Sequence, residues 1–298
     1  MRRLRFIPIL LAGIVVASGC GTSKPQPASA AKDAELLVRH EGRLGIVRDG
    51  SFDPLRGTED KELARIALAD DGRRVAAITS ENRLCIFSPG KTDFRFLADE
   101  GDGQDSRFAP GILNVALLPD EERLLVQTYD TVFDLYDLKG KWISRLLDTS
   151  PNALSLRCPI WSPDGKQLAF IAGDDLWVAD RKTDSLRQLT STRAVEDDPA
   201  WSPDGLWIFF SSDMDARRVG RPDADAERDV YRMRPNGLNL QRLTTDPGEE
   251  ARPLPWGPDS VLFARRGTKP CLLKLDIATG EQTEIASGEF DLIGFVRM

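Results

Sequence analysis

The sequence predicts an all-β fold, a six-bladed β-propeller of four-stranded antiparallel blades, from a motif that recurs along the chain. The motif reads Trp-Ser-Pro-Asp-Gly at residues 161–165 and 201–205, and Trp-Gly-Pro-Asp-Ser at 256–260. Each copy precedes a short apolar segment and an alternating one, and the first two repeats then reach Leu-Thr, at 189–190 and 243–244. Repeats of this size with four strand-sized pieces are typical of propeller blades. A β-sandwich with recurring turns is the alternative, which the repeated spacing disfavours.

Each part of the motif has a physical role in such a blade. The tryptophan ends the innermost strand, where a large flat side chain fills the wedge between neighbouring blades. Ser-Pro-Asp-Gly forms a turn, because proline presets φ near −65° and glycine accepts positive φ. The strand that follows is apolar because adjacent blades cover both of its faces.

Weaker copies of the repeat complete the ring. Residues 68–72 and 117–120 occupy the turn position upstream, which gives five blades that start near residues 62, 110, 155, 196 and 249. Strand-like segments without a turn motif lie at both ends of the chain, over 36–55 and 290–296. We expect these ends to share the sixth blade, which would leave no open sheet edge. Seven blades is the alternative.

The first 33 residues are expected to lie outside the propeller. Residues 1–19 carry three arginines and a twelve-residue apolar run that is too short to span a bilayer. Small residues then precede Cys20, so the segment resembles a bacterial lipoprotein signal in which Cys20 is lipidated; a plain secretory signal is the alternative. Residues 20–33 are predicted to be a flexible tether and 34–298 a single propeller domain.

Charge excludes one class of partner. The chain has 40 basic and 47 acidic residues and a formal net charge of −7, and removal of the signal segment would make it more acidic. This balance argues against nucleic acid or an anionic surface as a partner.

Few residues could support catalysis, so we expect no enzyme, no metal and no cofactor. His40 is the only histidine, which limits a Ser-His-Asp triad and excludes a multi-histidine metal site. Propellers also occur as gates on prolyl-peptidase catalytic domains, but no such domain is expected after the last repeat. Cys85, Cys158 and Cys271 are widely spaced and odd in number, so we expect free thiols, with one disulfide plus a spare as the alternative.

Charged residues at one mouth of the channel are the candidate partner-binding site. Arg157, Asp197 and Arg252 each lie four positions ahead of a repeat tryptophan, so they should form a mixed-charge rim, together with the acidic runs at 196–198 and 249–250. An insertion over 213–228 departs most from the repeat, and its charged candidates for partner contact are Arg217, Arg218 and Arg221. Solvated loops without a ligand are the alternative.

The repeat as a whole resembles the TolB-type β-propeller repeat. The match is strong over 155–263, where Pro159, Pro199 and Pro255 supply its leading proline, and weaker over 60–150. The resemblance implies the fold and a cell-envelope location on the periplasmic side, but no specific partner. Gly21, directly after Cys20, indicates an outer-membrane destination if the bacterium has one. We therefore expect a monomeric, lipid-anchored, non-enzymatic interaction scaffold that binds envelope proteins. The alternatives are a propeller that binds a small ligand or glycan in its channel and, third, a lyase or hydrolase.

Overall fold

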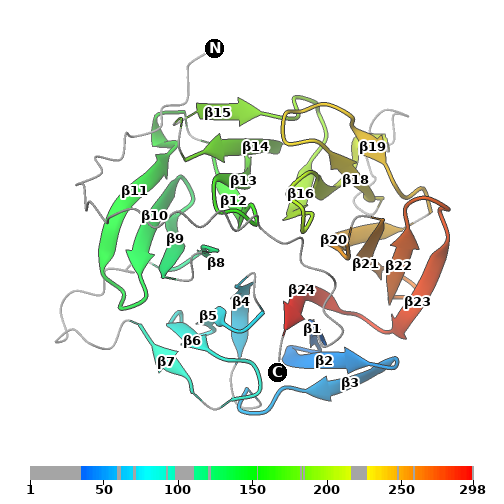
Figure 1. The fold of residues 1–298 in the computed structure, drawn as a ribbon, viewed down its shortest axis with the longest axis horizontal. Helices are drawn as coiled ribbons and strands as arrows, with labels where there is room; N and C mark the ends of the chain where they lie inside the picture. Colours follow the sequence, from blue (N-terminus) through cyan, green and yellow to red (C-terminus); the bar gives the residue numbers. More distant parts are fainter. Residues whose placement is uncertain are drawn as a thin grey trace, which may run out of the picture.

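The computed structural model describes most of the chain from residue 35 to residue 296. The described residues are 35–58, 62–69, 72–91, 93–97, 111–119, 122–152, 154–181, 183, 185–215, 227–246, 248–257 and 259–296. Their strands form six four-stranded sheets that surround a common centre, as Figure 1 shows. The predicted six-bladed propeller is therefore confirmed. The expected signal segment 1–19, Cys20, the tether 20–33 and the arginines Arg217, Arg218 and Arg221 lie outside the described residues.

Five blades follow the chain in order, each numbered here from its inner strand outward. Blade 1 contains β4 (Leu63–Leu68), β5 (Val75–Thr79), β6 (Leu84–Phe87) and β7 (Arg95–Phe96). Blade 2 contains β8 (Asn114–Leu117), β9 (Arg123–Tyr129), β10 (Val132–Asp137) and β11 (Trp142–Asp148), followed by the short helix η1 (Ser150–Asn152). Blade 3 contains β12 (Leu156–Trp161), β13 (Gln167–Ala172), β14 (Asp175–Asp180) and β15 (Ser185–Gln188). Blade 4 contains β16 (Glu196–Trp201), β17 (Ile208–Ser212), β18 (Asp229–Met233) and β19 (Gln241–Arg242). Blade 5 contains β20 (Glu249–Pro255), β21 (Ser260–Arg266), β22 (Cys271–Asp276) and β23 (Gln282–Ser287).

The sixth blade joins the two ends of the chain, as predicted. Its inner strand is β24 (Asp291–Val296), and its other strands are β1 (Glu35–His40), β2 (Arg43–Arg48) and β3 (Ser51–Pro54). β24 pairs antiparallel with β1, with Leu36 opposite Phe295, and the two strands lie side by side in Figure 1. This pairing closes the ring without a covalent link, so each blade has a neighbour on both sides.

The repeat tryptophans fill the wedges between blades in two of the three copies. Trp161 is 3% exposed and packs with Phe133 of blade 2 and Phe170 of blade 3 in one apolar cluster. Trp201 is 8% exposed and packs in the same way between blades 3 and 4. Trp256 differs, because β20 ends one residue before it, and the ring is only partly buried against Phe295 at a centroid distance of 5.1 Å.

The turn chemistry explains why the motif recurs. In the first copy, Ser162 Oγ donates to Asp164 Oδ1 at 2.8 Å and accepts from the amide of Gln167 at 2.9 Å. Gly165 closes the turn with φ 66°, a conformation that costs little without a side chain. In the second copy Ser202, Asp204 and Gly205 make equivalent contacts, so local hydrogen bonds set the β12–β13 and β16–β17 hairpins alike.

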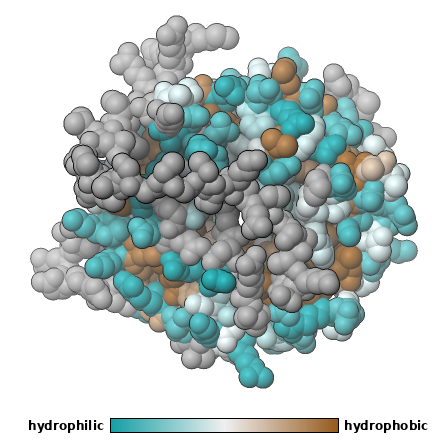
Figure 2. All heavy atoms as spheres, in the orientation of Figure 1, coloured by the Kyte–Doolittle hydropathy of each residue, from teal (hydrophilic) through white to brown (hydrophobic). Residues whose placement is uncertain are grey.

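The apolar core lies between the blades, and the outside is mainly polar. Figure 2 shows hydrophilic side chains over much of the visible described surface, with apolar residues scattered among them. Within the described part of the chain, no helix combines the length and the apolar character needed to cross a bilayer.

Candidate functional site

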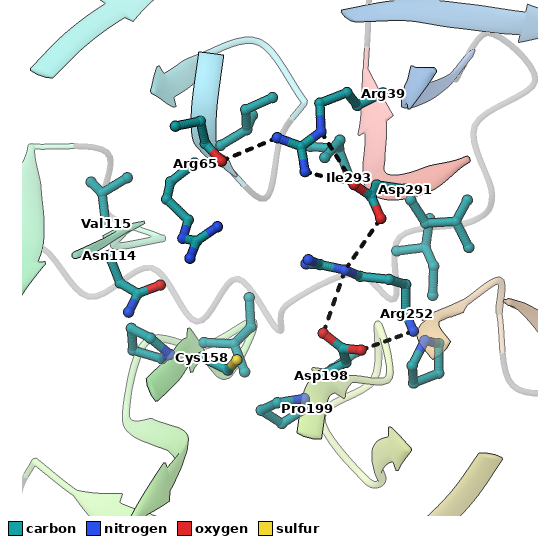
Figure 3. A pocket seen from close by; sticks show the side chains of 18 residues that line it. Arg39, Arg65, Asn114, Val115, Cys158, Asp198, Pro199, Arg252, Asp291 and Ile293 are labelled. Atoms are coloured by element: carbon teal, nitrogen blue, oxygen red, sulfur yellow. Dashed lines mark hydrogen bonds and ion pairs between the residues drawn. The ribbon is translucent and has the colours of Figure 1, made fainter. Parts of the chain in front are cut away.

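A cavity of about 220 Å³ lies at the centre of the ring. Every blade contributes to its wall through its inner strand, and β1 adds Arg39 (Figure 3). Residues near the beginnings of these strands gather at the same end of the ring, since the inner strand of each blade occupies the equivalent place. The wall combines apolar side chains with a small number of charged ones, which is the usual make-up of a ligand site.

Three consecutive inner strands carry the same backbone irregularity at the cavity wall. Cys158, Asp198 and Arg252 have φ of 50°, 49° and 56°, and each precedes a proline. The pairing register of β12, β16 and β20 shifts at these positions. Left-handed φ is unfavourable for residues other than glycine and typically costs 1–3 kcal/mol, so its recurrence at one place suggests a functional constraint.

The register corrects the alignment on which the rim was predicted. Ile160, Ala200 and Leu254 each resume the pairing with the second strand, which makes Cys158, Asp198 and Arg252 equivalent positions. The leading proline of the third repeat is therefore Pro253, not Pro255. Counting back from Trp256 was misleading because blade 5 has one more residue between its proline and its tryptophan.

Arg252 belongs to a chain of charges inside the cavity. Its Nε lies 3.4 Å from Asp198 Oδ1 and 3.9 Å from Asp291 Oδ1. Arg39 Nη2 lies 2.6 Å from Asp291 Oδ2, and Arg39 Nη1 donates to the carbonyl oxygens of Leu63 and Ala64. The order Arg39–Asp291–Arg252–Asp198 is visible in Figure 3. It ties blades 6, 5 and 4 together, and Arg39 ties blade 6 to blade 1.

These contacts alter the acidity of the two carboxyl groups. Burial favours the neutral form of Asp291, but the hydrogen bond from Arg39 and the charge of Arg252 hold its pKa below the ordinary value. Burial raises the pKa of Asp198 despite the charge of Arg252, and the neighbouring charge of Asp197 acts in the same direction.

Arg157 and Asp197 are brought together at the mouth, beside the cavity. Arg157 Nε lies 3.7 Å from Asp197 Oδ1, and Arg228 Nη1 lies 3.4 Å from Asp197 Oδ2. Burial would raise the pKa of Asp197, but a hydrogen bond from Cys158 and the charges of Arg157 and Arg228 lower it. Arg228 is the last residue of the insertion, so the end of that insertion meets the rim. Of the three predicted rim residues, Arg157 and Asp197 therefore lie together at the mouth, whereas Arg252 lines the cavity and pairs with Asp198.

The acidic runs divide into rim and core residues. Of the run at 196–198, Asp197 lies at the mouth, Asp198 lines the cavity, and Glu196 is completely buried. Glu196 accepts from Thr190 Oγ1 at 2.8 Å and from Ser212 Oγ at 3.2 Å, and burial raises its pKa to about 7. Glu250, at the equivalent position, is also completely buried but is paired with Arg265 at 2.7 Å.

Several residues of the cavity were missed by sequence reasoning. Arg39 and Asp291 come from the terminal strands, where no turn motif sets the phase, and Arg65 comes from a weak copy of the repeat. The expected pairing of the chain ends was the signal that could have found Arg39 and Asp291. In the observed β24–β1 register these two residues lie opposite each other.

The donor atoms of Cys158, Asp197 and Asp198 lie within 4.8 Å of one another, as a metal site requires. Their surroundings do not suit a cation, because Arg157, Arg228 and Arg252 already contact the two carboxylates. Burial, together with Asp197, also raises the pKa of the Cys158 thiol, which opposes metal binding by a thiolate. These residues therefore suit an ion-pair network better than a metal.

His40 and the cysteines hold structural positions. His40 stacks on Phe290 at a centroid distance of 4.5 Å, and its Nδ1 lies 2.7 Å from the carbonyl oxygen of Glu289. Cys85, Cys158 and Cys271 are free thiols, as expected, and Cys85 and Cys271 are buried.

Comparisons with known proteins match one family model and curated relatives over parts of the chain. A family model described as the dipeptidyl peptidase IV N-terminal region matches residues 114–198, which run from β8 into β16. The chain is 39% identical over 70 residues to the uncharacterized peptidase YuxL of Bacillus subtilis. The aligned segment covers 24% of this chain and 10% of that protein. This chain is also 31% identical over 88 residues to an uncharacterized protein of Agrobacterium fabrum. That alignment covers 28% of this chain and 27% of the other protein. The chain thus matches only minor parts of these relatives.

Solved structures match most of the chain. A candidate TolB of Agrobacterium tumefaciens aligns with a TM-score of 0.60 at 18% identity, over 87% of this chain and 91% of the other. TolB of Acinetobacter baumannii aligns with a TM-score of 0.61 at 14% identity, over 88% and 66%. The tricorn protease aligns with a TM-score of 0.51 at 13% identity, over 86% and 30%. With the six closed blades and the Trp-Ser-Pro-Asp-Gly turns, these likenesses show that the chain has the fold of a TolB-type β-propeller.

Proposed function

We propose that this protein is a non-enzymatic interaction scaffold of the cell envelope, which binds a partner protein at the mouth of its central cavity. The observation that carries the proposal is the charged mouth. Arg157, Asp197 and Arg228 are about a quarter exposed and held in place by mutual ion pairs. Charged side chains fixed in this way favour orientation and specificity of binding over raw affinity.

The position of the insertion supports the same mouth. Asp213 accepts the amide of Val195, just ahead of β16, and Arg228 contacts Asp197. Both ends of the insertion are therefore anchored beside the inner strand of blade 4. Loops that project from a rigid ring commonly make partner contacts, and Arg217, Arg218 and Arg221 would supply charged ones.

A non-enzymatic role fits the groups that the mouth offers. The single histidine is stacked on Phe290 in blade 6, and the carboxylates of Asp197, Asp198 and Asp291 are engaged by arginines. Matches to peptidases cover repeat segments of the propeller, so they support a shared fold rather than shared chemistry. We further propose that Cys20 carries the lipid anchor and that the propeller lies on the periplasmic side, as the signal-like residues 1–19 indicate.

A pull-down from the solubilised envelope of the native host tests this function. The double variant Arg157→Gln and Arg228→Gln removes two mouth charges, and Lys166→Gln with Arg187→Gln removes two exposed charges away from it. With about 1 kcal/mol for each contact, the mouth variant should bind its partner about 30-fold more weakly, and the control should bind as the wild type does. Deletion of residues 216–226 should also weaken capture while the unfolding midpoint stays unchanged. Equal capture by folded mouth variants would contradict the proposal.

A further inference from the structure

The central cavity holds two arginines whose terminal nitrogens have no hydrogen-bond acceptor among the described residues. Arg65, on β4, makes no ion pair or hydrogen bond within that part of the chain, and its side chain projects into the cavity (Figure 3). The Nε of Arg252 lies 3.4 Å from Asp198 and 3.9 Å from Asp291, and it is a buried atom without a well-formed hydrogen bond. The hydrogen bond that Arg252 does make to Asp198 comes from its backbone amide. Figure 3 shows the tip of Arg252 pointing into the same open space as Arg65.

The balance of charge in the cavity favours an anion. Among the described lining residues, Arg39, Arg65 and Arg252 are positive, and Asp198 and Asp291 are negative. The Cys158 thiol adds no charge, because burial raises its pKa. One positive charge is therefore left over inside a chain whose net charge is −7. Two guanidinium groups facing one space repel each other, and an anion between them would remove that cost and supply the missing acceptors.

We propose that the cavity binds a carboxylate group between Arg65 and Arg252. This inference rests on the proposed function, because the carboxylate is taken to belong to the group that a partner protein inserts at this mouth. A planar carboxylate matches the donor fork of a guanidinium. A singly charged ligand fits the single excess charge, whereas a phosphate dianion would be repelled by Asp198 and Asp291. Val115, Leu254 and Ile293 offer apolar contact for the body of the ligand.

Calorimetric titration of the purified full-length chain with isovalerate, a singly charged carboxylate with a small branched body, tests the site. The neutral amide isovaleramide and inorganic phosphate are the matched probes. Arg65→Gln removes the charge at an exposed side chain that has no partner in the described fold, so the ring should remain folded. Arg187→Gln, on the outer strand β15, is the control variant.

We expect isovalerate to bind the wild type and Arg187→Gln alike, and Arg65→Gln about tenfold more weakly, since hydrogen bonds to charged groups are of that strength. Isovaleramide and phosphate should bind more weakly than isovalerate. Undiminished binding by Arg65→Gln, equal binding of the amide, tighter binding of phosphate or no binding of isovalerate would each overturn the proposal. A blocked tripeptide with a central glutamate identifies the source of the carboxylate. If the tripeptide binds more tightly than isovalerate, the natural ligand is a protein side chain; if it binds more weakly, the natural ligand is a free carboxylate.

The two proposals fail separately. The titration contains no envelope partner, so a negative result overturns the carboxylate site and leaves the pull-down to decide the scaffold function. Conversely, isovalerate binding that depends on Arg65, together with unchanged capture by the mouth variants, would retain the site and overturn the protein partner.

Discussion

The most informative single substitution is Glu196→Gln, because Glu196 is completely buried and its carboxyl group forms no ion pair with the described residues. Its two acceptor atoms receive hydrogen bonds from Thr190 and Ser212. Burial raises its pKa to about 7 from an ordinary value of 4.5, and the nearby charges of Asp175 and Asp213 act in the same direction. Folding therefore favours the protonated form of this group.

The direction and size of the pH dependence follow from that shift. The folded protein binds a proton at Glu196 that the unfolded chain has already lost between about pH 4.5 and pH 7, so stability from this group is complete below pH 4.5 and is lost as the pH rises through 7. A shift of this size corresponds to about 3 kcal/mol in total, of which about 2–3 kcal/mol falls between pH 5 and pH 8. Glutamine does not titrate, so Glu196→Gln should not show this loss.

Urea unfolding of both proteins at pH 5, 6, 7 and 8 measures the effect. The stability of the variant relative to the wild type should rise by about 2–3 kcal/mol from pH 5 to pH 8. A difference in unfolding free energy that is the same at every pH reports how well the glutamine amide fits the buried site, and it does not affect the pH dependence that is compared. Glu250→Gln is the matched control. Burial raises the pKa of Glu250 as well, but hydrogen bonds from Thr244 and Arg265 oppose that shift, so the difference between Glu250→Gln and the wild type should vary less with pH. Parallel curves for the wild type and Glu196→Gln would refute the reasoning.

Two further substitutions test the packing of the ring. Trp161→Ala should lower the free energy of unfolding by about 3–5 kcal/mol, because the side chain is 3% exposed in the wedge between blades 2 and 3; a loss below about 1 kcal/mol in urea unfolding would contradict that role. Arg39→Ala removes contacts to Asp291 and to the carbonyl oxygens of Leu63 and Ala64, so it should lower the free energy of unfolding by about 1–3 kcal/mol. Amide hydrogen exchange should become faster in β24 and β1 but not in blade 4, and an equal rise in all blades would contradict a local effect on ring closure.

The parts of the fold that could be predicted are those set by local chemistry. The hairpins β12–β13 and β16–β17 depend on Ser-Pro-Asp-Gly turns, whose hydrogen bonds involve residues close in sequence. The five inner strands begin at residues 63, 114, 156, 196 and 249, close to the expected positions. Closure by the termini was predicted because each end held an incomplete set of strands.

The parts that could not be predicted depend on contacts between distant residues. The extra residue before Trp256 shifts blade 5 by one place, which only the pairing of β20 with β21 reveals. Arg252 meets Asp291 across a blade boundary. Arg39 meets Asp291 only because the two ends of the chain pair within blade 6, so no local spacing in the sequence encodes either contact.

The buried glutamates are a different case, because a signal was present. An acidic run usually indicates a solvated surface, yet Glu196 and Glu250 each follow the threonine of a Leu-Thr pair by six residues. Thr190 Oγ1 accepts from the amide of Leu176 and donates to Glu196, which holds the carboxyl group between strands. The repeated spacing of threonine and glutamate could have indicated a structural role.

Mapped photo-crosslinking tests most directly whether partners bind at the channel mouth. A photoreactive benzoyl-phenylalanine is placed at Arg157 in one variant and at Arg187 on the outer strand β15 in another, and each is expressed in the native host. We expect a discrete covalent adduct with an envelope protein from position 157 and none from position 187. The same adduct from position 187 alone, or equal adducts from both positions, would contradict binding through the central mouth.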